Sequence, residues 1–452
     1  MNQRFKQGRL SGLVIASLSL ASASGLALSL TACGGSGTSL SSGDSTGGGV
    51  VKASPKVVQS ALSRNTQPVA SNAEVLAVAK GQNQFALQSL NALSGSNSNL
   101  IFSPYSLNYA LAMTAAGANG ETLQGMAKAL AYPYTQDKMM PALNKLDLML
   151  AAKTKGGDQP VFSAANALWA QQGFTLAPSY LDNLAIHYGA PVQTLDFMTQ
   201  AEPARVAMNE WVAQQTKDRI KDLFPPNSIT SDTRLVLSNA VWFKGSWAEQ
   251  FKPEQNTTQS FRLLNGSSVN TTFMQAVLSA PYLKTSQYQA VDLAYQGGQL
   301  SMLVIQPETG KWQAVLNDLD ADKLAQLSQD LTKATSRIAL SMPKFSYSAD
   351  TKIKPVLQRF GMTQAFTPGQ ADLSGMTGAK GLVISDILHK AFIQVDETGS
   401  EAAAATGVVI GVTSIPQAPV EVKLDQAFIY LIRDRETGVI LFAGVLQNPQ
   451  AK

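Results

Sequence analysis

Residues 397–414 (ETGSEAAAATGVVIGVTS) form a run of small and β-branched residues that constrains the fold more than any other stretch of the sequence. Successive residues of a strand point to opposite faces of a sheet, so a strand here would carry Ser400 and alternate alanines of 402–405 on one small, uncharged face. Its one internal charge, Glu401, would point the other way. Such a segment can enter an existing sheet without large side chains to accommodate or charges to desolvate.

A helix is the alternative structure for this run, because alanine is the best helix former. The glycines at 399, 407 and 411 disfavour a long helix, while the Val-Val-Ile sequence favours a strand. The run lies between two predicted strands, and a connection of more than twenty residues in a compact domain is typically functional or disordered. We therefore expect an exposed loop over about residues 397–420.

The N-terminus has the pattern of an export signal. Three cations precede an apolar stretch, Leu13–Leu30, and the sequence then reads Leu-Thr-Ala-Cys up to Cys33, an ending that resembles a bacterial lipobox. Cys33 is the only cysteine of the chain, so lipid attachment would give it a use that a disulfide cannot. We expect residues 1–33 to be a lipoprotein signal peptide and the protein to be exported, either anchored to the cell envelope or secreted. A plain secretory signal or a membrane-spanning helix is the alternative.

The composition indicates one large domain or two ordinary ones, since 45% of the 452 residues are hydrophobic and 15% are charged. Residues 34–50 are rich in Gly and Ser. We predict a flexible linker over 34–70, followed by the folded domain at 71–450. The net charge of +4 includes three cations of the signal, and no Lys/Arg run forms a patch, so we expect no nucleic-acid partner.

The residues that enzymes need are poorly represented. Histidine occurs only at 187 and 389, and neither lies in a pattern typical of a nucleophilic hydrolase. The sequence has no Gly-x-Ser-x-Gly, His-Glu-x-x-His or Cys-x-x-Cys motif, and no phosphate-binding or dinucleotide-binding loop. We therefore expect no enzyme activity, no metal site and no cofactor.

Helical periodicity dominates the first half of the domain and strand patterns dominate the second, which is typical of an α+β fold. The predicted helices lie at 71–93, 107–116, 178–188, 204–216, 311–329 and 351–360. The predicted strands lie at 161–170, 235–244, 271–276, 289–294, 301–306, 336–343, 390–396, 421–423, 427–434 and 439–445.

Six segments resemble, in order and spacing, the sequence signatures of the serpin family, and the resemblance covers about residues 71–450. They are Phe102–Ser106 (FSPYS), Asn239–Trp247 (NAVWFKGSW), Met342–Phe345 (MPKF), Ala371–Met376 (ADLSGM), His389–Ala391 (HKA), and a C-terminal set of Phe428, Ile429, Tyr430, Ile432, Arg433, Phe442, Gly444 and Pro449. The resemblance implies three β-sheets, about nine helices and an exposed reactive-centre loop.

The same resemblance implies a suicide mechanism of protease inhibition. A target serine protease would attack the loop and form an acyl-enzyme, and the cut loop would insert as a new strand into the central sheet. The attached protease would be carried to the far end of the molecule and distorted before it deacylates. Completion of an under-filled sheet would drive this change.

Within the loop, the resemblance assigns a hinge that consists of Glu397, Gly399, Ser400, Glu401, Ala402, Ala403, Ala404 and Ala405. Inhibitory serpins resemble this pattern, whereas non-inhibitory members often carry bulky, charged or proline residues there. Counting seventeen residues from Glu397 puts the reactive bond between Thr413 and Ser414, with the bond between Val412 and Thr413 as the alternative.

Two polar clusters follow from the resemblance. In the first, the breach, Lys344 and Glu397 would form an ion pair beside Trp247 at the top of the central sheet. Two unrelated surface charges are the alternative for this pair. The second cluster, the shutter, would lie under the centre of the sheet, where opening begins. Its members are Ser103, Ser106, Asn239 and His389.

No Arg or Lys occurs between Glu397 and Val420, which disfavours trypsin-like proteases because their acidic pocket needs a cation. The small aliphatic residues of the loop favour elastase-like or subtilisin-like serine proteases. A papain-like cysteine protease that reads Val412 is an alternative target. A non-inhibitory surface binding protein is the second hypothesis, and an unrelated hydrolase or transporter-associated lipoprotein is the third.

The expected partners are few. We expect a monomer that forms a covalent complex with its protease and reaches the membrane through its lipid anchor. No basic cluster marks a glycosaminoglycan site, so we expect no such partner.

Overall fold

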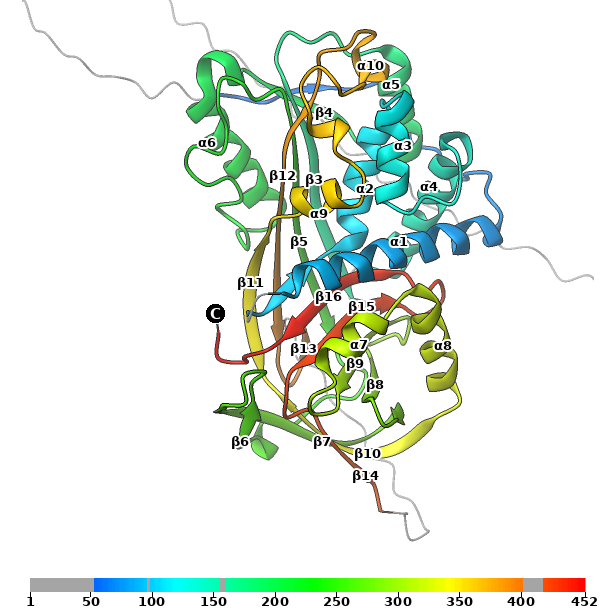
Figure 1. Cartoon of the computed structure of the whole chain (residues 1–452), viewed down its shortest axis with the longest axis vertical. Coiled ribbons are helices and arrows are strands. Elements are labelled where there is room, and N and C mark those ends of the chain that lie inside the picture. The colour runs from blue at the N-terminus through cyan, green and yellow to red at the C-terminus, as the bar shows by residue number, and fades with distance from the viewer. Residues whose placement is uncertain (1–52, 96–97, 155–159, 401–417, 452) are drawn as a thin grey trace, which may run out of the picture. The chain divides into compact units, whose positions relative to one another are not determined.

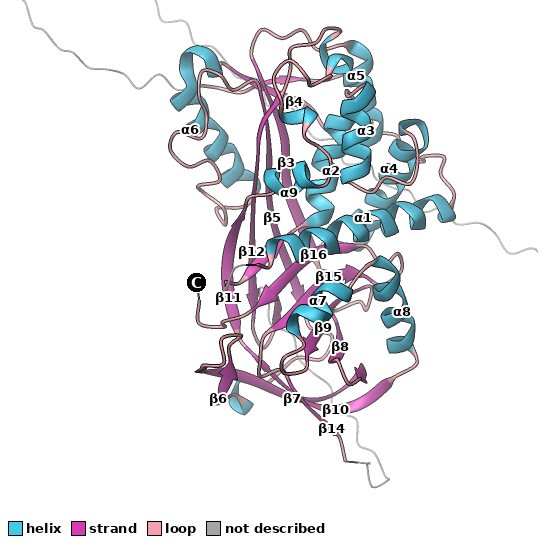
Figure 2. Cartoon of the chain, in the orientation of Figure 1, coloured by secondary structure: helices cyan, strands magenta, loops and turns pink. Residues whose placement is uncertain are grey.

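The protein has an α+β fold, seen in a computed structural model that describes residues 53–95, 98–154, 160–400 and 418–451 (Figures 1 and 2). No helix in these ranges is long and apolar enough to cross a membrane. The helices in these ranges are α1 (Asn72–Leu93), α2 (Pro104–Ala115), α3 (Gly120–Ala129), α4 (Gln136–Lys153), α5 (Pro178–Asn183), α6 (Phe197–Gln215), α7 (Trp312–Asp318), α8 (Ala321–Thr332), α9 (Lys354–Arg359) and α10 (Ser374–Thr377), with short turns η1 (Leu184–Tyr188), η2 (Pro253–Gln255) and η3 (Gln364–Phe366).

A seven-stranded sheet carries the region that the sequence singles out. Its strand order is β1-β4-β3-β5-β13-β12-β11. The bounds are β1 (Lys56–Val58), β4 (Val192–Leu195), β3 (Val161–Gln171), β5 (Leu235–Ser246), β13 (Gly399–Ser400), β12 (Ile384–Val395) and β11 (Phe345–Thr351).

The remaining strands form a nine-stranded array in the order β14-β10-β7-β8-β9-β15-β16-β2, with β6 also paired to β7. The bounds are β14 (Val420–Lys423), β10 (Thr335–Pro343), β7 (Ser268–Lys284), β8 (Tyr288–Ala294), β9 (Leu300–Pro307), β15 (Phe428–Asp434), β16 (Ile440–Leu446), β2 (Leu100–Phe102) and β6 (Thr257–Arg262). The long β7 pairs with β6 and β10 along most of its length and with β8 at its last three residues. The three expected sheets thus appear as one seven-stranded sheet and two sheets that β7 joins.

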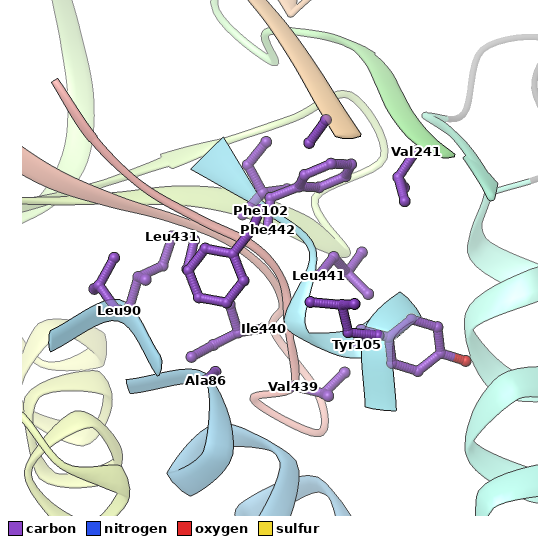
Figure 3. Packing of buried hydrophobic residues seen from close by; sticks show 14 of the residues in the cluster. Ala86, Leu90, Phe102, Tyr105, Val241, Leu431, Val439, Ile440, Leu441 and Phe442 are labelled. Atoms are coloured by element: carbon purple, nitrogen blue, oxygen red, sulfur yellow. The ribbon is translucent and has the colours of Figure 1, made fainter. Parts of the chain in front are cut away.

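The main core lies where α1 and α2 meet both sheets. Every residue of α2 is buried, including the polar Ser106, Asn108 and Thr114. Figure 3 shows Phe102, Tyr105 and Phe442 among aliphatic side chains of α1, β5, β15 and β16. The ring of Phe442 also makes a T-shaped contact with that of Phe162, with 5.7 Å between centroids. This packing fixes β5 against the rest of the domain.

A second, smaller core covers the other side of the seven-stranded sheet. Phe197, Met208 and Val212 of α6 are buried in one cluster with Trp169 of β3 and Ala240 of β5. The predicted helix at 204–216 is therefore the second part of a longer element, which kinks at Gln200. The predicted helix at 311–329 is in fact two, because the Asp320 side chain caps α8.

The prediction of a flexible linker over 34–70 is wrong for its last part. Residues 56–58 form β1, which pairs antiparallel with β4 at the edge of the sheet. Further along, Ser60 donates to Asp182, and Arg64 forms an ion pair with Asp147 at 2.7 Å. The linker was predicted because the Gly/Ser-rich stretch 34–50 was taken to continue through this segment, but backbone and polar side-chain hydrogen bonds hold the segment to the domain.

Asn144 of α4 anchors this N-terminal strap, which we define as residues 56–70. The Asn144 side chain is fully buried, and its Nδ2 donates to the carbonyl oxygens of Asn65 at 2.8 Å and Ile186 at 3.3 Å. Its Oδ1 accepts from Arg64 Nε at 2.9 Å. One side chain therefore joins the strap to two helical elements.

We expect Asn144→Ala to loosen the strap, because it leaves the Asn65 carbonyl without its side-chain donor and removes one of the partners of the Ile186 carbonyl and of the Arg64 guanidinium. The free energy of unfolding should fall by about 1 to 3 kcal/mol, and limited proteolysis should cut residues 59–70 faster. Ser63→Ala is the matched control, since Ser63 is exposed in the same segment. Equal proteolysis of the two variants would contradict the anchoring role of Asn144.

Candidate functional site

The seven-stranded sheet is open at one end. β12 and β5 pair directly and in parallel from Ile384 and Leu235 up to Phe392 and Trp242. Beyond this point β13 lies between them: Ser400 pairs with Val395 of β12 and with Gly245 of β5. Two residues of the predicted hinge thus lie between β5 and β12 at one end of the sheet. Along the rest of their length these two strands pair directly with each other.

A tight turn brings the chain from β12 into this gap between the two strands. The amide of Asp396 donates to the carbonyl of Gly399 at 2.9 Å, and the Thr398 amide and hydroxyl donate to the Asp396 carboxylate. Gly399 has φ of +153°, and a Cβ atom there would overlap the carbonyl oxygen of Gly245. Only glycine fits this position, both for its backbone conformation and for the close approach of β5.

The first inserted side chain, Ser400, is held by a buried tyrosine. Ser400 is 1% exposed, and its hydroxyl lies 2.8 Å from that of Tyr295. The Tyr295 ring stacks on Trp247 with 4.8 Å between centroids and 8° between planes. A small polar side chain is therefore accommodated at 400, while a large or charged one would meet this aromatic pair.

The breach residues meet at the same end of the sheet. Lys344 Nζ contacts the two carboxylate oxygens of Glu397 at 2.7 and 2.9 Å, and the Asn256 amide donates to the same carboxylate. Burial alone would raise the pKa of Glu397, but Lys344 and Asn256 outweigh it and hold this pKa below its ordinary value. Trp247 Nε1 donates to the carbonyl of Asp396 at 2.9 Å, so the indole holds the turn itself.

The shutter residues form one buried hydrogen-bonded network. Ser103 Oγ donates to the carbonyl of Leu441 at 2.6 Å and accepts from the Ser106 amide. Asn239 Nδ2 donates to Ser106 Oγ at 2.7 Å. His389 pairs with Asn239 in the β12–β5 register, and its Nδ1 contacts the Asn239 side chain. The network therefore spans the ladder that closes the gap.

His389 is a neutral side chain in this network. Its Nε2 accepts from the amide of Ser103 at 3.0 Å, so the ring proton belongs on Nδ1, facing the Asn239 carbonyl oxygen. Burial lowers the pKa of His389 to about 3. The ring acts as a structural donor and acceptor between β12, β5 and the start of α2.

Three residues of the site were missed by sequence reasoning. Asn166 of β3 accepts from Ser106 and Asn239, Tyr295 holds Ser400, and Asn256 holds Glu397. The signal for Asn166 was present, because it is the only amide in the apolar strand 161–170. Tyr295 and Asn256 carried none, since they lie after a strand and in a loop far from the hinge in sequence.

The other predicted site residues lie outside the described residues. These are hinge residues Glu401, Ala402, Ala403, Ala404 and Ala405, reactive-bond residues Val412, Thr413 and Ser414, and Cys33.

Comparisons with known proteins agree with the geometry. The family described as Serpin (serine protease inhibitor) matches residues 80–449. An uncharacterized serpin-like protein of Thermococcus kodakarensis is 36% identical over 81% of this chain and 85% of its own length. A leukocyte elastase inhibitor of Xenopus laevis is 32% identical over 79% of this chain and 94% of its own length. The crystal structure of a thermophilic serpin, tengpin, in its native state covers 88% of this chain and all of its own, with 26% identity and a TM-score of 0.75.

The neutral His389 makes stability depend on pH. Below pH 6.5 the unfolded chain binds a proton at this ring that the native fold does not, so stability falls as the pH falls. The stability difference between wild type and His389→Asn, measured by urea unfolding, should narrow by about 2 to 3 kcal/mol between pH 7.5 and 4.5.

His187→Asn is the control for this measurement, because His187 is only half-buried. It should leave most of the pH dependence of unfolding in place. If wild type and His389→Asn lose stability in parallel as the pH falls, the His389 network does not contribute as described.

Gly399→Ala should expel β13 from the sheet, because the added Cβ cannot coexist with Gly245. We expect faster amide hydrogen exchange at 399–400 and a change in the fluorescence of Trp247, with a loss of about 1 to 3 kcal/mol in stability. Gly266→Ala is matched in having positive φ but open space around the added Cβ. Unchanged exchange at 399–400 in Gly399→Ala would rule out the tight fit.

Proposed function

The chain belongs to the serpin family of serine protease inhibitors, and we propose that it is a suicide inhibitor of elastase-like or subtilisin-like serine proteases. The observation that carries this proposal is the position of β13. Gly399 and Ser400 already lie between β5 and β12, in register with both strands. The small-residue run follows them in the sequence. If it continued as a strand, it would pair with residues further along β5 and β12.

Insertion of the cut loop would require the β5–β12 ladder to separate. The direct pairing from Phe392 and Trp242 down to Ile384 and Leu235 would be replaced by a new antiparallel strand between them. The contact of His389 with Asn239 is one of the interactions that must break. The backbone hydrogen bonds lost between β5 and β12 would be replaced by bonds from β5 to the new strand. The bonds from the new strand to β12 would be an additional set.

The composition of the loop supports this insertion. Alternate residues from Ser400 onward are small and uncharged. Ser400 is the first residue of that face, and it is buried. A charged residue would have to be desolvated there. The loop offers no Arg or Lys, so the pocket that reads it should be small and apolar.

We place the cut between Thr413 and Ser414, and the bond between Val412 and Thr413 is the alternative. The acyl-enzyme would form on the residue before the cut, with the proton of the attacking serine passing to the released amine through the protease's own base. The inhibitor supplies no catalytic group. Its contribution is to move the acylated protease before water can reach the ester.

The cellular setting is part of the proposal. We propose that residues 1–33 direct export, that Cys33 carries a lipid, and that the mature protein is a monomer on the cell envelope or in the medium. Labelling of wild type and Cys33→Ser with a radioactive fatty acid tests the anchor, since only the wild type should incorporate the label.

The inhibitory function is tested by mixing the protein with pancreatic elastase or subtilisin and analysing the products on a denaturing gel. We expect a covalent complex of about 1:1 stoichiometry, and mass spectrometry of the released C-terminal peptide fixes the bond. Papain in a parallel reaction reveals a cross-class inhibitor. Cleavage with no complex by any of these proteases would reject the inhibitory mechanism.

Ser400→Arg should convert the inhibitor into a substrate, because an arginine cannot enter the site beside Tyr295. The covalent complex should fall at least about tenfold while cleavage continues, since burying an unpaired charge costs several kcal/mol. Glu401→Arg is the control, because the next residue points to the opposite face of the strand. Equal loss of the covalent complex in both variants would contradict the claim that residues 400 and 401 point to opposite faces of the inserted strand.

A further inference from the structure

We propose that the N-terminal strap places the attachment point of an anchored molecule at the end of the seven-stranded sheet opposite to the hinge. The length of the segment before the strap then decides whether an inhibited protease fits between the domain and that surface. This inference rests on the proposed function.

The sheet register defines the point of entry. Lys56 of β1 pairs with Thr194 of β4, Thr194 with Ala170 of β3, and Ala170 with Leu235, the first residue of β5. The entry point therefore lies in the row of residues that starts β5. The hinge lies at the other end of the same strand, where Gly399 and Ser400 pair with Ser246 and Gly245.

The two points are separated by about the whole length of β5. Ten to eleven residues lie between these rows, which corresponds to about 35 Å at the rise of a β-strand. Figure 1 shows the same arrangement, with β4 and β13 toward opposite ends of the long strands.

The direction of β1 shows at which end the chain enters the strand. β1 is antiparallel to β4, so Val58 lies nearer the hinge than Lys56, and the strand begins at its end remote from the hinge. Ala53 packs against the small core under α6. The bonds of Ser60 to Asp182 and of Arg64 to Asp147 hold the strap after β1, so the entry point cannot move along the sheet.

The proposed mechanism brings a protease to this end of the molecule. Insertion of the loop from Ser400 onward along β5 would deliver the acylated residue toward the row of Leu235, beside the entry point. A protease of roughly 230 residues is about 45 Å across. Between Cys33 and the described domain the sequence has residues 34–52, which can span about 65 Å at most. The tether of an anchored molecule is therefore long enough to leave room for an inhibited protease, but only by about 20 Å at full extension.

Deletion of Ser36–Gly48 tests the inference, because the six residues left before Ala53 span about 20 Å at most. The chain from Cys33 onward contains every described residue, and Cys33 is its only cysteine. It can be coupled through that thiol to phosphatidylcholine vesicles that contain a maleimide lipid, whether or not the cell acylates it. Subtilisin is then added, and cleaved chain and covalent complex are counted on a gel.

We expect the anchored deletion variant to be cleaved in its loop at the rate of the anchored full-length chain. Its yield of covalent complex should fall at least about fivefold, because a tether too short to span the gap forbids the final arrangement. The same deletion variant in solution, and an anchored variant with thirteen Gly/Ser residues replacing the deleted ones, should form complex normally.

Two results would overturn the inference. An undiminished complex yield from the anchored deletion variant would mean that the protease does not end beside the entry point. Loss of cleavage itself would mean that the loop faces the surface. Failure of the soluble full-length chain to form any complex would instead reject the proposed function, and it is visible in the uncoupled control.

Discussion

The structure depends on a gap between β5 and β12 that two residues occupy. Gly399 and Ser400 enter this gap with hydrogen bonds to both neighbours, and the turn before them is held by the Trp247 indole. An unfilled gap in the middle of a sheet leaves backbone groups without partners, which is unfavourable. The site and the proposed mechanism both follow from where this gap begins.

The directly paired part of β5 and β12 resists extension of the gap. Below Phe392 and Trp242 the two strands pair directly, and the shutter network ties them to each other and to the start of α2. A buried polar network is stable only when every member is satisfied, so it forms or breaks as a unit. Under the proposed mechanism, opening of the sheet requires this network to be disrupted first, which would keep the intact sheet closed until the loop is cut.

Much of this arrangement was predictable from sequence. The hinge, the Lys344–Glu397 pair and the four shutter residues were named from short motifs, and the structure brings the described members of each set together. The strands β3 and β5 were predicted because continuous apolar runs mark buried strands, whereas the prediction at 390–396 covered only the second half of β12. Tyr295 and Asn256 were not found, because a partner that reaches the site from a distant loop leaves no local pattern. The strap was read as a linker for a related reason: its attachment relies on Asn144 and on backbone pairing rather than on an apolar face of its own.

Thermal unfolding before and after a cut in the reactive loop, made by a protease that the protein does not trap, tests loop insertion most directly. If the freed segment enters the gap, it adds about ten backbone hydrogen bonds worth about 1 kcal/mol each, and the Tm should rise by at least about 10 °C. The cut chain should also show slow amide exchange along β5 and β12. An unchanged or lower Tm after cleavage would contradict insertion, and with it the proposed inhibitory mechanism.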